Sequence, residues 1–499
     1  MSHLTPPVLP PAITIATGSE IRLEVPASPI TRLPIEILAE TLVRWAELDH
    51  DAPWIASLVS HLWRATVLSE PRAWSRIYLP LKGPSVELED PEWCTEEDHD
   101  VRDRRRPLAL WLERATLSPD LFLNIQINRI APLATTLYAV LKQFTPHLPS
   151  LREFELSTAS TLLADGILKT FWTCTPRLQR ITIDCRAESK SLIEVIDDRN
   201  RVLPHLWATL AKAPSVSAVV LKGCLPPQQP LASASGSRLL SLSFHGPFRS
   251  DDFKDMMLSI GVCEALEELT ITNANTSTSV PPVTLLALKV LRVHNSALLA
   301  THDILKSIHA PQLLTLDLGG RIPESVLESM RKESSGGQQS MREMLNIMET
   351  FGVALGSFST RSPFIRHLTL DGVHVKDRFL ITALKNLPYV VELCLRDSFI
   401  SGLALGALSR VGPPHKDGVR SPTALKSPVL CPDLRRLSLD TCPLLTGKMV
   451  QDLVKARTSS SLITNLDIHR CKLVGEVDVV VVKELGPYAM RVEFTPLEE

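Results

Sequence analysis

The sequence predicts an α/β protein, in which a small N-terminal helical domain precedes a long, irregular repeat solenoid with a parallel sheet on its concave face. Two observations predict this architecture. Three apolar residues with the spacing Leu-x-x-Leu-x-Leu recur through the C-terminal two-thirds of the chain. All eight tryptophans, in contrast, lie between Trp45 and Trp207, which indicates two cores of different design.

The repeated triplet predicts one short strand per unit. The copies are Leu151-Phe154-Leu156, Leu178-Ile181-Ile183, Val216-Val219-Leu221, Leu239-Leu242-Phe244, Leu266-Leu269-Ile271, Leu288-Leu291-Val293, Leu313-Leu316-Leu318, Ile365-Leu368-Leu370, Val390-Leu393-Leu395, Leu434-Leu437-Leu439 and Ile463-Leu466-Ile468. Most intervals fit a unit in the mid-twenties, and we interpret the 52 residues from Leu313 to Ile365 as two units with one copy eroded. No single unit could bury its apolar face alone, so the units must stack. Ala300–Ile308 and Asp377–Asn386 have helical spacing and would form the convex layer.

Composition divides the chain further. Residues 1–30 contain six prolines and little periodicity, and we expect a disordered tail. A helical domain is expected over 31–80, and a linker region with an acidic loop at Glu87–Asp100 and the first strand and helix elements over 81–145. The solenoid would occupy 146–499. Segments rich in Pro, Ser and Gly are expected to be mobile loops: Leu225–Ser237, Asn273–Pro282, Glu333–Ser340 and Val411–Pro432.

The helical domain has more apolar surface than a small core needs. Pro34 suits the first turn of a helix, and a second helix is expected after Pro53. At about 100° per residue, one arc about 160° wide holds six apolar side chains of the first helix. They are Ile35, Leu38, Ala39, Leu42, Val43 and Trp45. Ile37 lies outside this arc among charged residues, and the excess of apolar surface suggests a partner.

From about residue 145 to 499 the chain resembles a leucine-rich repeat solenoid. The ninth position of the family pattern is Asn or Cys, and Cys224, Cys442 and Cys471 occupy it here. In the family this side chain bonds to loop backbone at the exit of the strand. We therefore interpret these cysteines as buried structural thiols rather than as metal ligands or redox groups.

Residues 31–79 resemble the F-box, especially the F-box-like domains of mushroom-forming fungi. The landmarks are Leu33-Pro34, Glu36-Ile37-Leu38, Leu58-Val59, Trp63-Arg64, Pro71, Trp74 and Ile77, followed by the stretches Leu110–Ala115 and Leu121–Ile127. Ser60-His61 departs from the family, which has Cys followed by a basic residue, and the loop Glu47–Ala52 is short.

The resemblance implies a substrate-receptor subunit of a cullin-type (SCF) ubiquitin ligase. The F-box would bind a Skp-type adaptor on the cullin complex, and the repeats would bind an unknown target protein. The residues implied for adaptor binding or for the domain core are Leu33, Pro34, Ile37, Leu38, Leu58, Trp63 and Trp74. Of these, Ile37 is the best candidate for the interface because it lies off the core arc.

The concave face is the expected site for the target, because side chains alternate along a strand. The outward position after each triplet is Asp184, Lys222, His245, Thr272, His294, Gly319, Asp371, Arg396, Asp440 and His469. This row is mixed in sign, which favours a protein target over a nucleic acid.

Other function classes lack their signatures. The formal charge of −2 gives no electrostatic footprint for nucleic acid or for a membrane surface. No phosphate-binding, dinucleotide-binding, nucleophile-elbow or HExxH motif occurs, so we expect no enzyme, metal or cofactor. The N-terminus is not a secretory signal and no apolar stretch could span a bilayer, which indicates the cytoplasm or the nucleus.

Two alternatives stay open. A leucine-rich-repeat scaffold without a ubiquitin role would use the N-terminal helices only to cap the solenoid. A GTPase-activating or other catalytic regulator would use an exposed arginine on the repeats.

Overall fold

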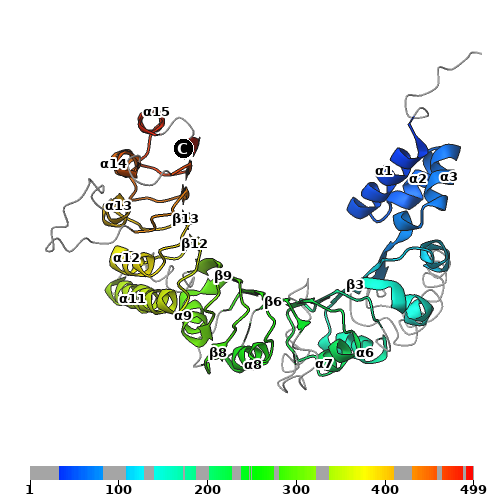
Figure 1. The fold of residues 1–499 in the computed structure, drawn as a ribbon. Coiled ribbons are helices and arrows are strands. Elements are labelled where there is room, and N and C mark those ends of the chain that lie inside the picture. The colour runs from blue at the N-terminus through cyan, green and yellow to red at the C-terminus, as the bar shows by residue number, and fades with distance from the viewer. Residues whose placement is uncertain are drawn as a thin grey trace, which may run out of the picture. The chain divides into compact units, whose positions relative to one another are not determined.

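The computed structural model describes residues 33–81, 108–127, 140–171, 175–186, 202–226, 238–246, 248, 250–274, 280–321, 337–409, 430–457, 463–486 and 490–497. They form an α/β protein with N-terminal helices and then a 14-stranded sheet that alternates with helices (Figure 1). The chain divides into two compact units, Met1–Ala73 and Trp74–Glu499. The predicted tail of residues 1–30 and the acidic loop of 87–100 lie outside the described residues.

The first unit contains three helices, α1 (Ile35–Leu48), α2 (Ala52–Val59) and α3 (His61–Ser69), followed by the short turn η2 (Pro71–Trp74). Leu38 and Leu42 of α1 are buried, as the helical arc predicted. The second helix expected at Pro53 is present as α2, but it ends at Val59, because Ser60 is extended and separates α2 from α3. The hydroxyl of Ser60 accepts a hydrogen bond from the backbone N–H of Trp63 at 3.2 Å and so caps α3.

The second unit is built on a parallel sheet in which the strands follow one another in chain order (Figure 1). Its strands are β1 (Arg76–Leu81), β2 (Leu121–Ile127), β3 (Leu151–Thr158), β4 (Arg180–Asp184), β5 (Ala218–Lys222), β6 (Ser241–His245), β7 (Glu268–Thr272), β9 (Val290–Ala297), β11 (Thr315–Arg321), β12 (His367–Asp371), β13 (Glu392–Arg396), β14 (Arg436–Asp440), β15 (Asn465–His469) and β16 (Arg491–Thr495). A separate pair joins β8 (Val283–Thr284) to β10 (Ile308–His309). The unit therefore has the repetitive β–α architecture of a leucine-rich-repeat-like solenoid.

Each predicted triplet coincides with a strand of this sheet, from β3 to β15. In β7, Leu269 and Ile271 are fully buried, whereas Glu268, Thr270 and Thr272 on the other face are not. The sheet also extends beyond the triplets, because β1 and β2 lie before residue 146 and β16 follows the last copy. The strand β2 alternates strictly between buried and half-buried residues and so lacks the spacing of the repeat.

The helices lie on one side of the sheet (Figure 1). They are α6 (Thr161–Phe171), α7 (Leu206–Lys212), α8 (Ser250–Ile260), α9 (Leu298–Ser307), α11 (Gly337–Arg361), α12 (Asp377–Lys385), α13 (Gly402–Ser409), α14 (Gly447–Arg457) and α15 (Glu476–Leu485). Both helical segments predicted between triplets are confirmed, as α9 and α12. We call the opposite side, which carries the outward strand positions, the open face.

The long interval between Leu313 and Ile365 has a different cause from the one expected. The strands β11 and β12 pair directly with each other, so the sheet holds no eroded copy between them, and that interpretation is wrong. The interval contains α11, which spans 25 residues. Its first turn begins at Gly337, so the expected loop Glu333–Ser340 is helical in its last residues.

Backbone hydrogen bonds continue past the ends of the strands. In six repeats the residue after the strand has a positive φ: Gly223, Asn273, Gly372, Asp397, Thr441 and Arg470. In β9 the corresponding residue, Asn295, also has a positive φ but lies within the strand. The N–H of Gly372 donates to the carbonyl of Arg396 at 3.0 Å, and the N–H of Arg470 donates to the carbonyl of Thr495 at 2.7 Å. The left-handed turn thus adds one more bond to the next repeat before the chain leaves the sheet.

We predict that Gly372→Ala destabilises the solenoid. At a φ of +62° an added Cβ would lie 2.6 Å from the carbonyl oxygen of Gly320, so the backbone must shift. We expect a loss of about 2 kcal/mol or more. Gly406→Ala is the control, because its Cβ would meet nothing within 4 Å in α13 and alanine favours the helix. Urea unfolding followed by circular dichroism measures both, and equal midpoints for the two variants would contradict this account.

Candidate functional site

The first unit exposes apolar side chains on its helices. At the start of α1, Ile37 is 54% exposed, and at the end of α2, Leu58 is 77% exposed. Among the described residues of this unit, 33–73, the exposed large apolar residues are Leu33, Ile35, Ile37, Leu48, Ile55, Leu58, Val59 and Leu68. Isolated apolar residues are normal on a surface, but seven of these eight lie on three neighbouring helices, which is more exposed apolar surface than a small domain needs.

The residues implied for the adaptor divide between surface and core. Leu33, Pro34, Ile37 and Leu58 are exposed, and Trp63 is half-buried with its ring edge-to-face against Trp45 at 6.4 Å. The exposure of Ile37 confirms the position predicted for it, whereas Ile35 of the core arc is exposed too.

Leu38 and Trp74 are buried, so neither can contact an adaptor directly. Trp74 is fully buried and belongs to the second unit. Its carbonyl accepts a hydrogen bond from Trp111 Nε1 at 2.8 Å, and Arg114 lies over its ring at 4.3 Å. The role of Trp74 is therefore to anchor the start of the repeat sheet.

The charges of the first unit neutralise one another. Arg44 pairs with Glu40 and Glu47, at 3.3 and 2.9 Å, and Arg72 pairs with Glu40 and Glu70, at 3.3 and 2.8 Å. The hydrogen bond from Arg72 lowers the pKa of Glu70 against the opposing effect of burial. The cations Arg44 and Arg72 are therefore already paired within the unit.

The outward row of the open face is a line of register pairs with one interruption. Register pairs join Asp184, Lys222, His245, Thr272 and His294 in sequence, and then Gly319, Asp371, Arg396, Asp440 and His469. A shift in register between Leu318 and Gly320 interrupts the line at β9 and β11. The same row continues to Ser157, which follows the first triplet, and to Gln126 and Thr495, which no triplet indicates.

Charges on the open face are also largely paired. Asp184 lies 2.6 Å from Arg186 and 3.6 Å from Lys222. Burial alone would raise the pKa of Asp184, but hydrogen bonds from Arg186 outweigh it and lower that pKa. At the C-terminal end, Arg470 binds Asp440 at 2.6 Å.

A second network joins the first residues of neighbouring strands, four residues before the outward row. Glu392 of β13 lies 3.0 Å from His367 and 3.4 Å from Arg436, and Arg436 also binds Asp467 at 3.1 Å. A target on this part of the face would meet charges that are already paired within the sheet.

The three cysteines at the ninth position of the repeat are buried and reduced. Cys442 and Cys471 each donate to a carbonyl of the preceding repeat, Leu395 at 3.6 Å and Leu439 at 3.7 Å, and Cys224 donates to Ile183 at 3.7 Å. The thiol of Cys471 and burial raise the pKa of Cys442 far above its usual range. In the part of the chain that the structure describes, no cluster of three or more His, Cys, Asp or Glu could hold a metal ion.

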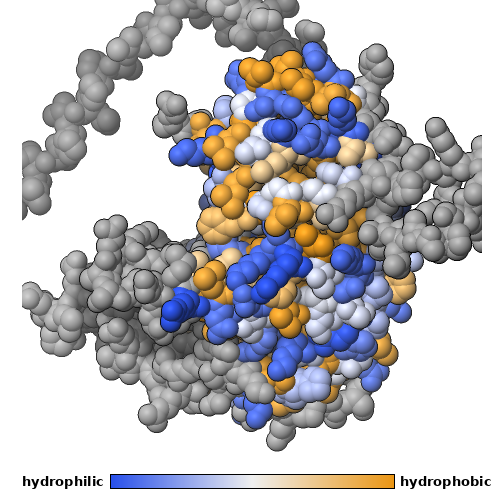
Figure 2. Space-filling model, turned by 90° about the vertical axis from the view of Figure 1, so that its left-hand side faces the viewer, coloured by the Kyte–Doolittle hydropathy of each residue, from blue (hydrophilic) through white to orange (hydrophobic). Residues whose placement is uncertain are grey.

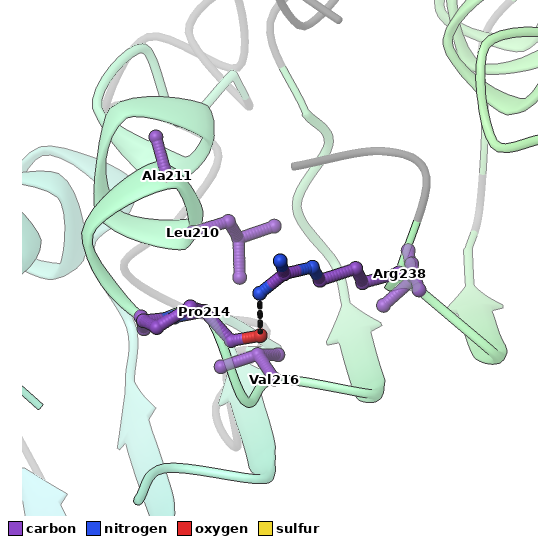
Figure 3. Close-up of a pocket in the computed structure, with 7 residues that line it drawn as sticks. Leu210, Ala211, Pro214, Val216 and Arg238 are labelled. Atoms are coloured by element: carbon purple, nitrogen blue, oxygen red, sulfur yellow. Dashed lines mark hydrogen bonds between the residues drawn. The ribbon is translucent and has the colours of Figure 1, made fainter. Parts of the chain in front are cut away.

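A pocket of about 220 Å³ lies between α7 and the segment before β6 (Figure 3). Leu210 and Val216 line it with apolar surface, and the guanidinium of Arg238 crosses it to donate to the carbonyl of Pro214 at 3.2 Å. Ligand pockets are usually larger, from about 300 Å³. The bond to Pro214 also occupies the one cation of this lining, so the pocket has the character of a packing gap.

Comparison with models of known protein families gives no match, and no curated protein is similar to the chain. Across the described ranges, no helix combines the length and the apolarity that crossing a bilayer requires.

The faces of α1 give opposite predictions for neighbouring residues. Leu38→Glu should unfold the first unit, because it places a charge in a core where Leu38 is 1% exposed. Ile37→Glu should leave folding unchanged, because Ile37 lies beside the exposed Glu36. Tryptophan fluorescence and limited proteolysis of the N-terminal helices measure both. Equal sensitivity of the two variants would contradict this assignment of faces.

Two histidines of the open face should titrate differently. A hydrogen bond to Asp317, whose Oδ2 lies 3.3 Å from His294 Nε2, raises the pKa of His294, whereas burial lowers the pKa of His245. The charged His294 pair therefore stabilises the fold below the unfolded pKa, about 6.5, and this contribution is lost as the pH rises through the higher folded value.

Asp317→Asn should lower the pKa of His294 and leave that of His245 in place. Burial and the nearby Arg292 would then oppose the charged imidazole, with only the more distant Asp371 still favouring it. Titration of histidine side chains by NMR measures both values. An unchanged His294 in the variant would refute the role of Asp317.

Proposed function

We propose that this chain is the substrate-receptor subunit of a cullin-type ubiquitin ligase. The N-terminal helices bind a Skp-type adaptor, and the open face of the repeat sheet binds a target protein. The observation that carries the proposal is the exposure of Ile37 and Leu58 on helices whose core is formed by Leu38 and Leu42. Ile37 and Leu58 are among the residues for which the F-box resemblance implies a role toward the adaptor.

The exposed apolar residues of α1 and α2 suit a partner of this kind. Apolar surface contributes roughly 25 cal/mol per Å² when it is removed from water, and a few central residues dominate most interfaces. Arg44 and Arg72 already form ion pairs within the unit, so an apolar partner surface would not leave these two cations unpaired. Both properties favour a stable adaptor complex.

The mechanism requires no chemistry from this chain. The adaptor would connect the first unit to the cullin and its ubiquitin-conjugating enzyme, while the repeat sheet holds the target. Holding two reactants together raises their effective concentration, and this proximity is the catalytic contribution of a receptor subunit. The mixed, internally paired charges of the open face favour a protein target. The cytoplasm and the nucleus are the compartments that fit this role.

A leucine-rich-repeat scaffold without a ubiquitin role is the second candidate. It is favoured by Ser60-His61, where the sequence departs from the F-box and where an extended residue separates α2 from α3. The two candidates differ in one property, which is binding of the adaptor.

Adaptor binding of the full-length chain therefore tests the proposal. Ile37→Glu should weaken binding by more than tenfold, or roughly 2–4 kcal/mol, because it removes an apolar contact and places an unpaired charge in the interface. Leu162→Glu is the matched control, since Leu162 is 71% exposed on α6 of the other unit. If the wild-type protein does not bind the adaptor, the ligase proposal is rejected and the scaffold without a ubiquitin role takes its place.

Intact binding by Ile37→Glu, in a wild-type protein that binds, would instead move the adaptor interface away from α1. Thermal unfolding of each variant accompanies the binding measurement. A loss of binding counts for the interface only where the unfolding midpoint equals that of the wild type.

A further inference from the structure

We infer that the edge of the sheet at which β12, β13 and β14 begin docks an acidic segment of a partner protein through an apolar anchor residue. We call this the aromatic edge and define it by Phe364, Arg366, Tyr389 and Arg435. The inference deepens the target-binding half of the proposed function and does not depend on the adaptor.

The anchor position is a pair of exposed, stacked aromatic rings. Phe364 precedes β12 and Tyr389 precedes β13, and their ring centroids are 5.7 Å apart with an angle of 25° between the planes. The side chains are 50% and 47% exposed. Exposed aromatic residues are enriched at protein interfaces, where they supply large contact areas at low entropic cost.

The backbone under both rings is held firmly. The next residues, Ile365 and Val390, are fully buried as first members of their triplets. The turn before Phe364 is tied to the preceding repeat by Ser362, whose hydroxyl donates to the carbonyl of Ala310 at 2.8 Å. The aromatic pair is therefore a preorganised feature, which reduces the entropic cost of binding.

Two exposed guanidinium groups lie one step further along the same strands. The N–H of Val391 donates to the carbonyl of Arg366, and the N–H of Arg435 donates to the carbonyl of Val391, both at 2.8 Å. The backbones of Arg366 and Arg435 thus flank that of Val391 on alternate strands. Both side chains are exposed, and neither has an ion pair among the described residues. Arg436, beside them, already binds Glu392 and Asp467.

The charge of this edge favours an acidic partner. Lys306 and Lys385 lie in the last turns of α9 and α12, at the same edge, and add to Arg366 and Arg435. Among the described turns before β12, β13 and β14, Asp433 is the one acidic residue, and it is exposed. Carboxylates of a partner would find two guanidinium groups free for bidentate bonds next to an aromatic anchor site.

Two other occupants fit less well. A second copy of the chain would place this basic edge against itself in a two-fold contact, and like charges would repel. A single-stranded nucleic acid needs a continuous basic track with open aromatic faces for its bases. Here Asp433 and Glu392 interrupt the cations, and each ring of the stacked pair covers one face of the other.

The probe is a displayed library of short random peptides, selected on the full-length chain. We expect enriched sequences in which Asp or Glu flanks an aromatic, leucine or proline residue. Phe364→Ala with Tyr389→Ala should weaken the enriched peptides by about tenfold or more, and Arg366→Glu with Arg435→Glu should do the same and remove the preference for acids. The second pair changes only exposed charges, so it keeps the test valid if the first pair lowers stability.

Controls on the other edge of the sheet separate this site from the open face in general. Phe399→Ala and Lys472→Glu change an aromatic residue and a cation that are also exposed, after β13 and β15, and should leave peptide binding unchanged. The inference is overturned if no peptide is enriched, if the enriched peptides lack acids, or if the control variants weaken binding equally. It is also overturned if a single-stranded oligonucleotide competes for the site with the same dependence on Arg366 and Arg435.

Adaptor binding is measured on the same proteins. Peptide binding without adaptor binding would retain the aromatic edge and reject the ligase. Adaptor binding without peptide binding would retain the ligase and reject the edge.

Discussion

The lateral register of the parallel sheet is the constraint on which the second unit depends. Each triplet strand from β3 to β15 buries apolar side chains toward the helices, as Leu269 and Ile271 do in β7, and each has a neighbouring strand on both sides. The left-handed residue that follows the strand adds a further bond, such as that from Thr441 to the carbonyl of His469 at 2.9 Å. Successive side chains of a strand point to opposite faces of the sheet, so this register also fixes which side chains reach the open face.

The same constraint explains what could be predicted from the sequence. The triplets locate the buried residues from β3 to β15 because burial of Leu at a fixed spacing is a local signal. The helical arc likewise places Ile37 on the surface and Leu38 in the core. The break at Ser60 was missed because it depends on a single capping bond to Trp63, which the apolar periodicity across the two helices concealed.

Other features need the register itself. The strands β1 and β2 join the sheet by simple alternation, without the spacing of the repeat, and the interval after β11 is filled by the helix α11 rather than by another unit. Nothing in the local sequence brings Phe364 next to Tyr389 or puts Arg366 and Arg435 on alternate strands. Figure 2 views the helix side around α11–α15 and shows apolar residues among polar ones. In α15, Val477 and Val480 are exposed.

The two units thus expose different kinds of surface. The first presents apolar side chains that lie outside its own core, and the second presents an ordered row of polar side chains. Native-state hydrogen exchange of the sheet tests the central claim, its register, most directly. The account predicts that the amides of Gly372, Thr441 and Arg470, which lie just beyond their strands, exchange as slowly as strand amides, since each donates to the next repeat. Exchange of these amides at the rate of exposed turns, beside protected strands, would contradict it.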